Sequence, residues 1–117
     1  MAIEVDDQPS PNLSAAVRTG NSLFVSGLLA EGEALKGDGA AQTRDILRKL
    51  DAIIAKAGFA RTDVRDLLVY ATDEDAGKAA AAVCRETFGA KTAISPVKAS
   101  LVLEGGRVEI MTCLERG

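Results

Sequence analysis

Hydrophobic positions follow two different spacings along the chain, one typical of strands and one typical of helices. Short runs with the first pattern predict strands at 15–19, 23–28, 64–71, 98–103 and 107–114. Gly20 and Asn21 join the first two strands and suit the backbone of a tight hairpin turn. The run at 64–71 contains consecutive apolar residues, which predicts an inner strand covered on both faces.

Two amphipathic helices are predicted between these strands. In the first, the apolar residues that share one helical stripe are Ile46, Leu47, Leu50, Ile53, Ile54 and Ala57. Asp38 is placed to cap the start of this helix, and Gly58 can end it in a left-handed conformation. The second helix is rich in alanine, begins after Thr72 or Asp73 and ends before Gly89. Its small side chains predict close packing.

The order of elements is β-β-α-β-α-β-β, within a single domain over residues 1–117. Residues 1–12 are expected to form an extended lead-in, and 30–39 and 90–95 are expected to be loops. This order predicts an α+β fold: a two-layer sandwich in which a single mixed sheet carries two helices on one face.

The other face of the predicted sheet has no helix to cover it, so it is either polar or in contact with another copy of the protein. In the last strand Glu109, Met111 and Cys113 share this face. A carboxylate among soft apolar groups is unusual for a freely solvated surface. We therefore expect this face to be buried between subunits, with its few polar groups lining a cleft.

The amino-acid composition limits the reactions and the partners that the chain can have. Aromatic residues are 3% of a chain that is 47% hydrophobic, so the core must be aliphatic. The net charge is −3 and there is no histidine, which disfavours nucleic-acid binding and excludes a Ser-His-Asp mechanism. Cys84 and Cys113 lack zinc-ligand spacing. We expect a cytoplasmic protein with reduced thiols, no metal or cofactor, and neither nucleic acid nor membrane as a partner.

Several short motifs occur in a definite order along residues 13–114. They are Ser14–Arg18, Gly20–Gly27, Gly37-Asp38, Gln42–Arg44, Asp63-Val64, Val69–Asp73 and Val108–Ile110. Together they resemble the Rid family, also called YjgF/YER057c/UK114. The resemblance implies a chorismate-mutase-like subunit that forms a homotrimer with clefts at the subunit interfaces.

The resemblance also implies an activity and a set of site residues. The best-known members hydrolyse small 2-imino or enamino acids to 2-keto acids and ammonia. In them a glutamate early in the last strand positions the attacking water, and this role falls on Glu109. The serine of the Phe-Val-Ser-Gly motif, which lines the cleft, falls on Ser26.

Other family positions carry different residues here. The cleft tyrosine is replaced by Leu13, and the carboxylate-binding arginine of the Pro-Ala-Arg motif by Lys98, in Pro96-Val97-Lys98. The cysteine that follows in the family is replaced by Ser100. Lysine keeps the charge but loses the two-pronged grip of arginine on a carboxylate. Leu13, Ser26, Lys98 and Ser100 are thus the predicted substrate-binding residues, and Glu109 is the predicted catalytic residue.

Three functions remain open from the sequence. The first is an imine or enamine deaminase that uses Lys98 and Glu109. The second is a homologue without deaminase activity, which binds a small carboxylate or keto acid or serves other small-molecule metabolism. The third, RNA cleavage, is disfavoured by the acidic balance and the absence of histidine. Glu109 could instead form an interface salt bridge with Lys98 or Arg107, and Lys98 could simply be solvated.

Overall fold

The computed structural model describes residues 2–5 and 16–117. In this part of the chain the strands are β1 (Ala2–Val5), β2 (Ala16–Thr19), β3 (Ser22–Leu29), β4 (Val64–Ala71), β5 (Ala93–Lys98) and β6 (Val108–Glu115), and the α-helices are α1 (Gly39–Ala57) and α2 (Glu74–Phe88). Two short 3-10 helices, η1 (Gly32–Lys36) and η2 (Arg61–Asp63), precede α1 and β4.

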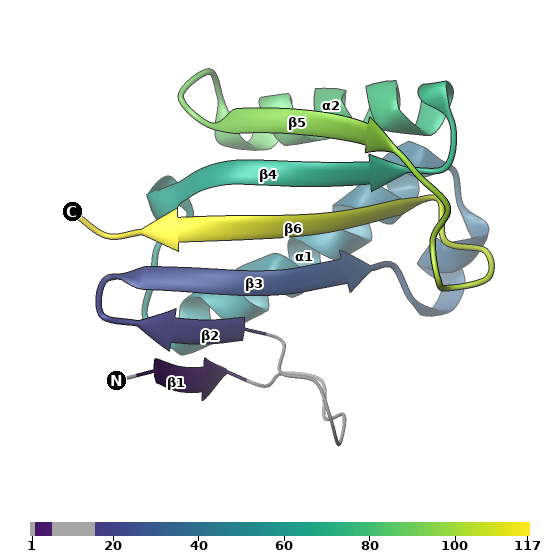
Figure 1. The fold of residues 1–117 in the computed structure, drawn as a ribbon. Helices are drawn as coiled ribbons and strands as arrows, with labels where there is room; N and C mark the ends of the chain where they lie inside the picture. Colours follow the sequence, from purple (N-terminus) through teal and green to yellow (C-terminus); the bar gives the residue numbers. More distant parts are fainter. Residues whose placement is uncertain (1, 6–15) are drawn as a thin grey trace.

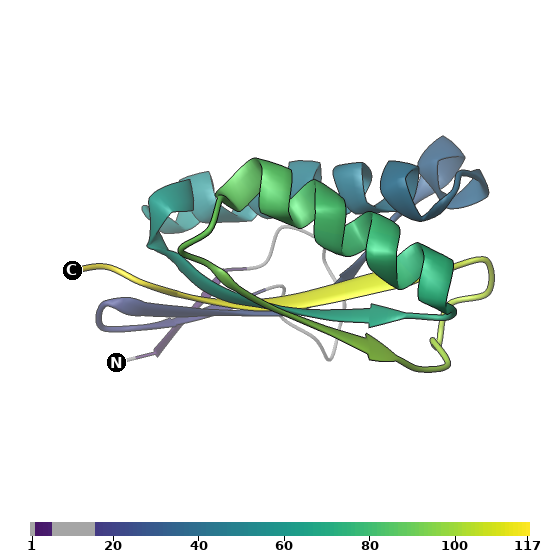
Figure 2. The ribbon, with the colours of Figure 1, turned by 90° about the horizontal axis from the view of Figure 1, so that it is seen from above.

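The strands form one mixed sheet in the order β1-β2-β3-β6-β4-β5 (Figure 1). β4 and β5 are parallel, and the other neighbouring pairs are antiparallel. Figure 2 shows α1 and α2 side by side on one face of the sheet, while the opposite face carries no helix from residues 2–5 or 16–117. The predicted α+β two-layer architecture is therefore confirmed.

The sequence signals for the helix ends and the first turn are also confirmed. The Asp38 side chain accepts a hydrogen bond from the Ala41 amide at 2.9 Å, and Gly58 ends α1 with a φ of +80°. The Asp73 side chain caps α2 in the same way. Gly20 has a φ of +60° in the two-residue turn between β2 and β3.

The core lies between the helices and the covered face of the sheet. Its fully buried aliphatic side chains include Leu23, Ile46, Leu50, Ile53, Leu67, Val69, Val108, Ile110 and Leu114. The helices approach each other closely at Gly39, where an added Cβ would lie only 2.9 Å from the Cα of Ala76. Small residues on α2 thus serve the close packing that the sequence predicted.

The strand predicted at 98–103 is wrong, as is the loop predicted at 90–95. β5 runs from Ala93 to Lys98, and Ile94 packs partly buried against the core. Pro96 is tolerated inside this strand because β5 is at the edge of the sheet, where one side of the backbone needs no partner. The apolar run that suggested the later strand lies in a loop, where Val102 is 94% exposed.

Part of the segment 1–12, which was expected to be an extended lead-in outside the sheet, belongs to the sheet instead. Ala2–Val5 forms β1, which pairs antiparallel with β2 and adds an outer strand to the sheet. Residues 6–15, which include the remainder of the predicted lead-in and Leu13, lie outside the described residues.

Candidate functional site

The face of the sheet opposite the helices is largely apolar, and we call it the open face. Its partly or fully exposed side chains include Phe24 on β3, Leu68 and Tyr70 on β4, Val97 on β5, and Met111 and Cys113 on β6. Phe24 is 52% exposed and Met111 is 40% exposed. The alternation predicted for the last strand is confirmed, because Val108, Ile110, Thr112 and Leu114 are buried on the opposite side.

Glu109 lies on the open face at the second position of β6. It is in register with Leu29 on β3 and Tyr70 on β4, and it is half-buried. β3 shifts its register between Val25 and Leu28, which indicates a bulge at Ser26 and Gly27. The Glu109 side chain lies over this bulge: a Cβ atom built on Gly27 would be 2.0 Å from Oε2 of Glu109.

The structure therefore brings together two of the predicted site residues, Ser26 and Glu109. Ser26 is exposed and directly precedes the glycine that the carboxylate covers. Gly27 joins the candidate site, although the sequence predicted no site role for it. A signal was present, since a glycine inside a strand often marks a bulge or the close approach of another group.

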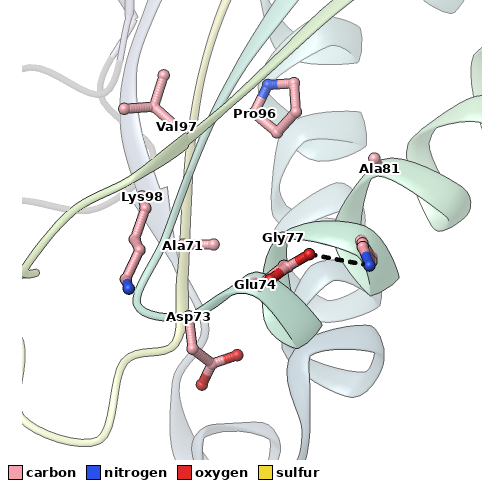
Figure 3. Close-up of a pocket in the computed structure, with 9 residues that line it drawn as sticks. Ala71, Asp73, Glu74, Gly77, Ala81, Pro96, Val97 and Lys98 are labelled. Carbon is pink, nitrogen blue, oxygen red and sulfur yellow. Dashed lines mark ion pairs between the residues drawn. The ribbon is translucent and has the colours of Figure 1, made fainter.

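A cavity of about 370 Å³ lies between the edge strand β5 and helix α2, on the helix side of the sheet. It is lined by small or apolar residues that include Ala71, Gly77, Ala81 and Pro96, and Lys98 lies at one end (Figure 3). At the rim, Lys78 forms an ion pair with Glu74 at 3.0 Å. We call this cavity the β5–α2 pocket.

Two lysines, Lys78 and Lys98, line this pocket. Unlike Lys78, Lys98 has no carboxylate partner within the described residues. It is in register with Ala71, which is buried on the helix side. Its predicted position at the start of the penultimate strand is wrong, because Lys98 ends β5 and Ala93 begins it. Ser100 is exposed in the following loop, and Leu13 lies outside the described residues.

Lys98 and Glu109 do not meet within one protomer. Lys98 is in the row of Ala71, on the helix side, whereas Glu109 is in the adjacent row with Tyr70, on the open face. β4 also separates their two strands. In these orientations, a site that uses both groups would combine Lys98 and Glu109 from different copies of the chain.

Burial affects the Cys113 thiol on the open face. Burial, together with the negative charge of Asp66, raises the pKa of the Cys113 thiol above its usual range.

Within residues 2–5 and 16–117 no group of three or more acidic, Cys or His side chains could hold a metal ion. In the same part of the chain neither helix is long and apolar enough to cross a membrane.

The sequence model of the family described as Endoribonuclease L-PSP matches residues 5–115. The chain belongs to this family, also named YjgF/YER057c/UK114 or Rid. The RutC family protein PH0854 of Pyrococcus horikoshii is 36% identical to this Rid protein over 77 residues. That match covers 61% of each chain, so this chain spans about three fifths of the length of that relative.

Solved structures of the Rid family share the whole fold. Rv2704 of Mycobacterium tuberculosis, a YjgF/YER057c/UK114 member, is 29% identical, with a TM-score of 0.87 over 99% of this chain and 100% of its own. RidA from the Antarctic bacterium Psychrobacter sp. PAMC 21119 is 25% identical, with a TM-score of 0.82 over 96% of this chain and 94% of its own.

Proposed function

We propose that this Rid protein hydrolyses small 2-imino or enamino acids to 2-keto acids and ammonia, in clefts between the subunits of a homotrimer. The observation that carries the proposal is the placement of the Glu109 carboxylate over Gly27, next to Ser26, on an apolar sheet face. A carboxylate held in such surroundings can orient and deprotonate a water molecule.

The open face supports the trimer. Several large apolar side chains, Phe24 and Met111 among them, are exposed there within one copy of the chain. Exposed apolar patches of this kind mark interaction sites. Closed rotational assembly of identical chains covers the same patch on every subunit.

The opposite orientation of Lys98 and Glu109 supports a cleft shared between subunits. In this arrangement the β5–α2 pocket of one subunit faces the Glu109 row of its neighbour, so that Lys98 and Glu109 line one cavity. The Lys98 ammonium would hold the substrate carboxylate, and the small pocket walls would receive a short side chain.

The reaction needs no group that the chain lacks. Glu109 takes a proton from water as the water oxygen bonds to the imine carbon, and the C=N π pair moves to nitrogen, which takes that proton from Glu109. Glu109 then takes the hydroxyl proton of the resulting carbinolamine and passes it to the amino nitrogen, so that the C–N bond breaks, ammonia leaves and the C=O bond forms. Imine and water are consumed, and keto acid and ammonia are produced. Histidine is not required, because Glu109 carries the proton.

A second function is binding of a small carboxylate or keto acid without turnover. It is favoured by Lys98, whose single ammonium holds a carboxylate less rigidly than arginine would. Tight binding of 2-ketobutyrate, with no ammonia release from the matching imine, would select this function. RNA cleavage is not proposed, because the chain has a net charge of −3 and no histidine.

The test is ammonia release from freshly generated 2-iminobutanoate by the wild type and by Glu109→Gln. Glu115→Gln is the matched control, since Glu115 lies at the exposed end of the same strand. We expect Glu109→Gln to lose at least about 100-fold in kcat, and the control to match the wild type. Equal rates for wild type and Glu109→Gln would reject the proposal.

A further inference from the structure

A second cavity, of about 570 Å³, lies at the opposite end of α2 from Glu74 and of β5 from Lys98. It is open to solvent and is lined by η2, the first residues of β4, the last turn of α2 and the loop at 89–92. We call it the η2 pocket. Neither Lys98 nor Glu109 lines it, so the proposed hydrolysis does not use it.

The η2 pocket is positively charged, although the chain as a whole is acidic. Arg61, Arg65 and Lys91 line it, and no carboxylate is among those of its lining residues that the structure describes. Asp51 neutralises Arg61 through two contacts, 3.2 Å to Nε and 2.5 Å to a terminal nitrogen. Arg65 and Lys91 have no ion-pair partner within the described residues, so two positive charges remain unbalanced.

The walls of the η2 pocket are held in place without Lys91. The guanidinium of Arg61 also lies over the Phe88 ring, 5.8 Å from its centre. A terminal nitrogen of Arg65 donates to the Glu115 carbonyl at 3.0 Å. Arg85 fixes the 89–92 loop by donating to the carbonyls of Gly89 and Thr92, at 2.6 and 3.0 Å. A site fixed in advance loses less conformational entropy when it binds a ligand.

We propose that the η2 pocket binds a small dianionic ligand, such as a molecule that carries a phosphoryl group or two carboxylates. Its two negative charges would balance the positive charges of Arg65 and Lys91. Charged hydrogen bonds from these two donors would orient the ligand. The Phe88 side chain offers an apolar surface to the uncharged part of the ligand. This binding is separate from hydrolysis at Glu109.

The experiment is calorimetric titration of the full chain with inorganic phosphate and, separately, with malonate, at constant ionic strength. We expect saturable binding of at least one of the two dianions, and the comparison shows which of them the pocket prefers. Lys91→Gln and Arg65→Gln should each weaken this binding about tenfold. Lys36→Gln is the control, since it removes the same charge from an exposed side chain on η1.

Two results would overturn the proposal. One is the absence of saturable binding of either dianion to the wild type. The other is equal weakening by Lys36→Gln and Lys91→Gln, which would mean that net charge alone attracts the anion. Because Lys91 is exposed and makes no ion pair among the described residues, the Lys91→Gln protein should fold like the wild type. Ammonia release should be unchanged in it.

Discussion

The Glu109 carboxylate occupies the space that a side chain at Gly27 would need. A Cβ at residue 27 would lie 2.0 Å from Oε2 and 2.8 Å from the carboxyl carbon of Glu109. These atoms would overlap, so the two positions are coupled: residue 27 must be glycine as long as residue 109 is glutamate in this conformation.

Gly27→Ala should therefore move the Glu109 side chain from its place above the bulge. The clashing carboxylate is the far end of a flexible side chain and can move aside, so we expect a cost of about 1 kcal/mol in the free energy of unfolding, at the low end for overpacking, together with a loss of most of the hydrolytic rate. In a Glu109→Ala background the clash is absent, so the same substitution should cost less. Urea unfolding of the four proteins in this double-mutant cycle measures the coupling. Additive effects would show that the two residues do not touch.

Substitutions of Lys98 test the proposed grip on the substrate carboxylate. Lys98→Met should raise the KM for 2-iminobutanoate at least about tenfold, because an uncompensated charge interaction is lost. Lys98→Arg should not show this rise in KM, since arginine holds a carboxylate through two nitrogens. Steady-state kinetics give the values, and Lys36→Met on η1 is the matched control. An unchanged KM in Lys98→Met would remove Lys98 from the site.

The open face should hold the trimer together. Met111→Asp places a charge among Phe24, Leu68 and other apolar side chains of that face, so we expect the assembly to dissociate. Sedimentation equilibrium measures the mass. Arg44→Asp, an exposed position on α1, is the control and should leave the mass unchanged. A wild type that sediments as a monomer would contradict the role given to this face.

The stability of the protein should fall at alkaline pH through Cys84. Burial raises the pKa of this thiol from its usual 9.0 to about 11, because the thiolate would be desolvated in the core. The neutral thiol is therefore favoured in the folded state, and its stabilisation is complete below the unfolded pKa. As the pH rises from about 9 to 11, the free energy of unfolding should drop by about 2–3 kcal/mol from this group.

Urea unfolding at several alkaline pH values, on wild type and Cys84→Ala, isolates this contribution. Other groups titrate equally in both proteins, so the difference between them reports on Cys84. The stability gap between the two should narrow as the pH rises. Parallel curves for the two proteins would show that Cys84 does not ionise differently on unfolding.

Much of the fold could be predicted because local signals agreed with tertiary packing. The caps at Asp38 and Gly58 and the alternation along β6 each follow from short-range chemistry that the sequence carries. β5 could not be predicted in this way. Its pairing with β4 is between distant segments, and an edge position makes Pro96 acceptable, while the exposed apolar loop around Val102 imitates a strand.

The candidate site also has some features that the sequence could predict and others that it could not. Placing Ser26 near Glu109 requires only two neighbouring antiparallel strands, β3 and β6, and the resemblance to the Rid family identified both residues. The contact of Glu109 with Gly27 depends on a bulge that shifts the register of β3. The orientation of Lys98 depends on the register of β5, so its separation from Glu109 could be seen only in the structure.

Mixing of two impaired variants tests most directly whether each site is shared between subunits. Lys98→Met and Glu109→Gln would be co-refolded in equal amounts, and ammonia release measured at low 2-iminobutanoate. If Lys98 and Glu109 of one site come from different subunits, random assembly leaves about a quarter of the sites with both native residues, and about a quarter of the wild-type rate should return. A mixture no more active than the average of its two parents would contradict the shared site.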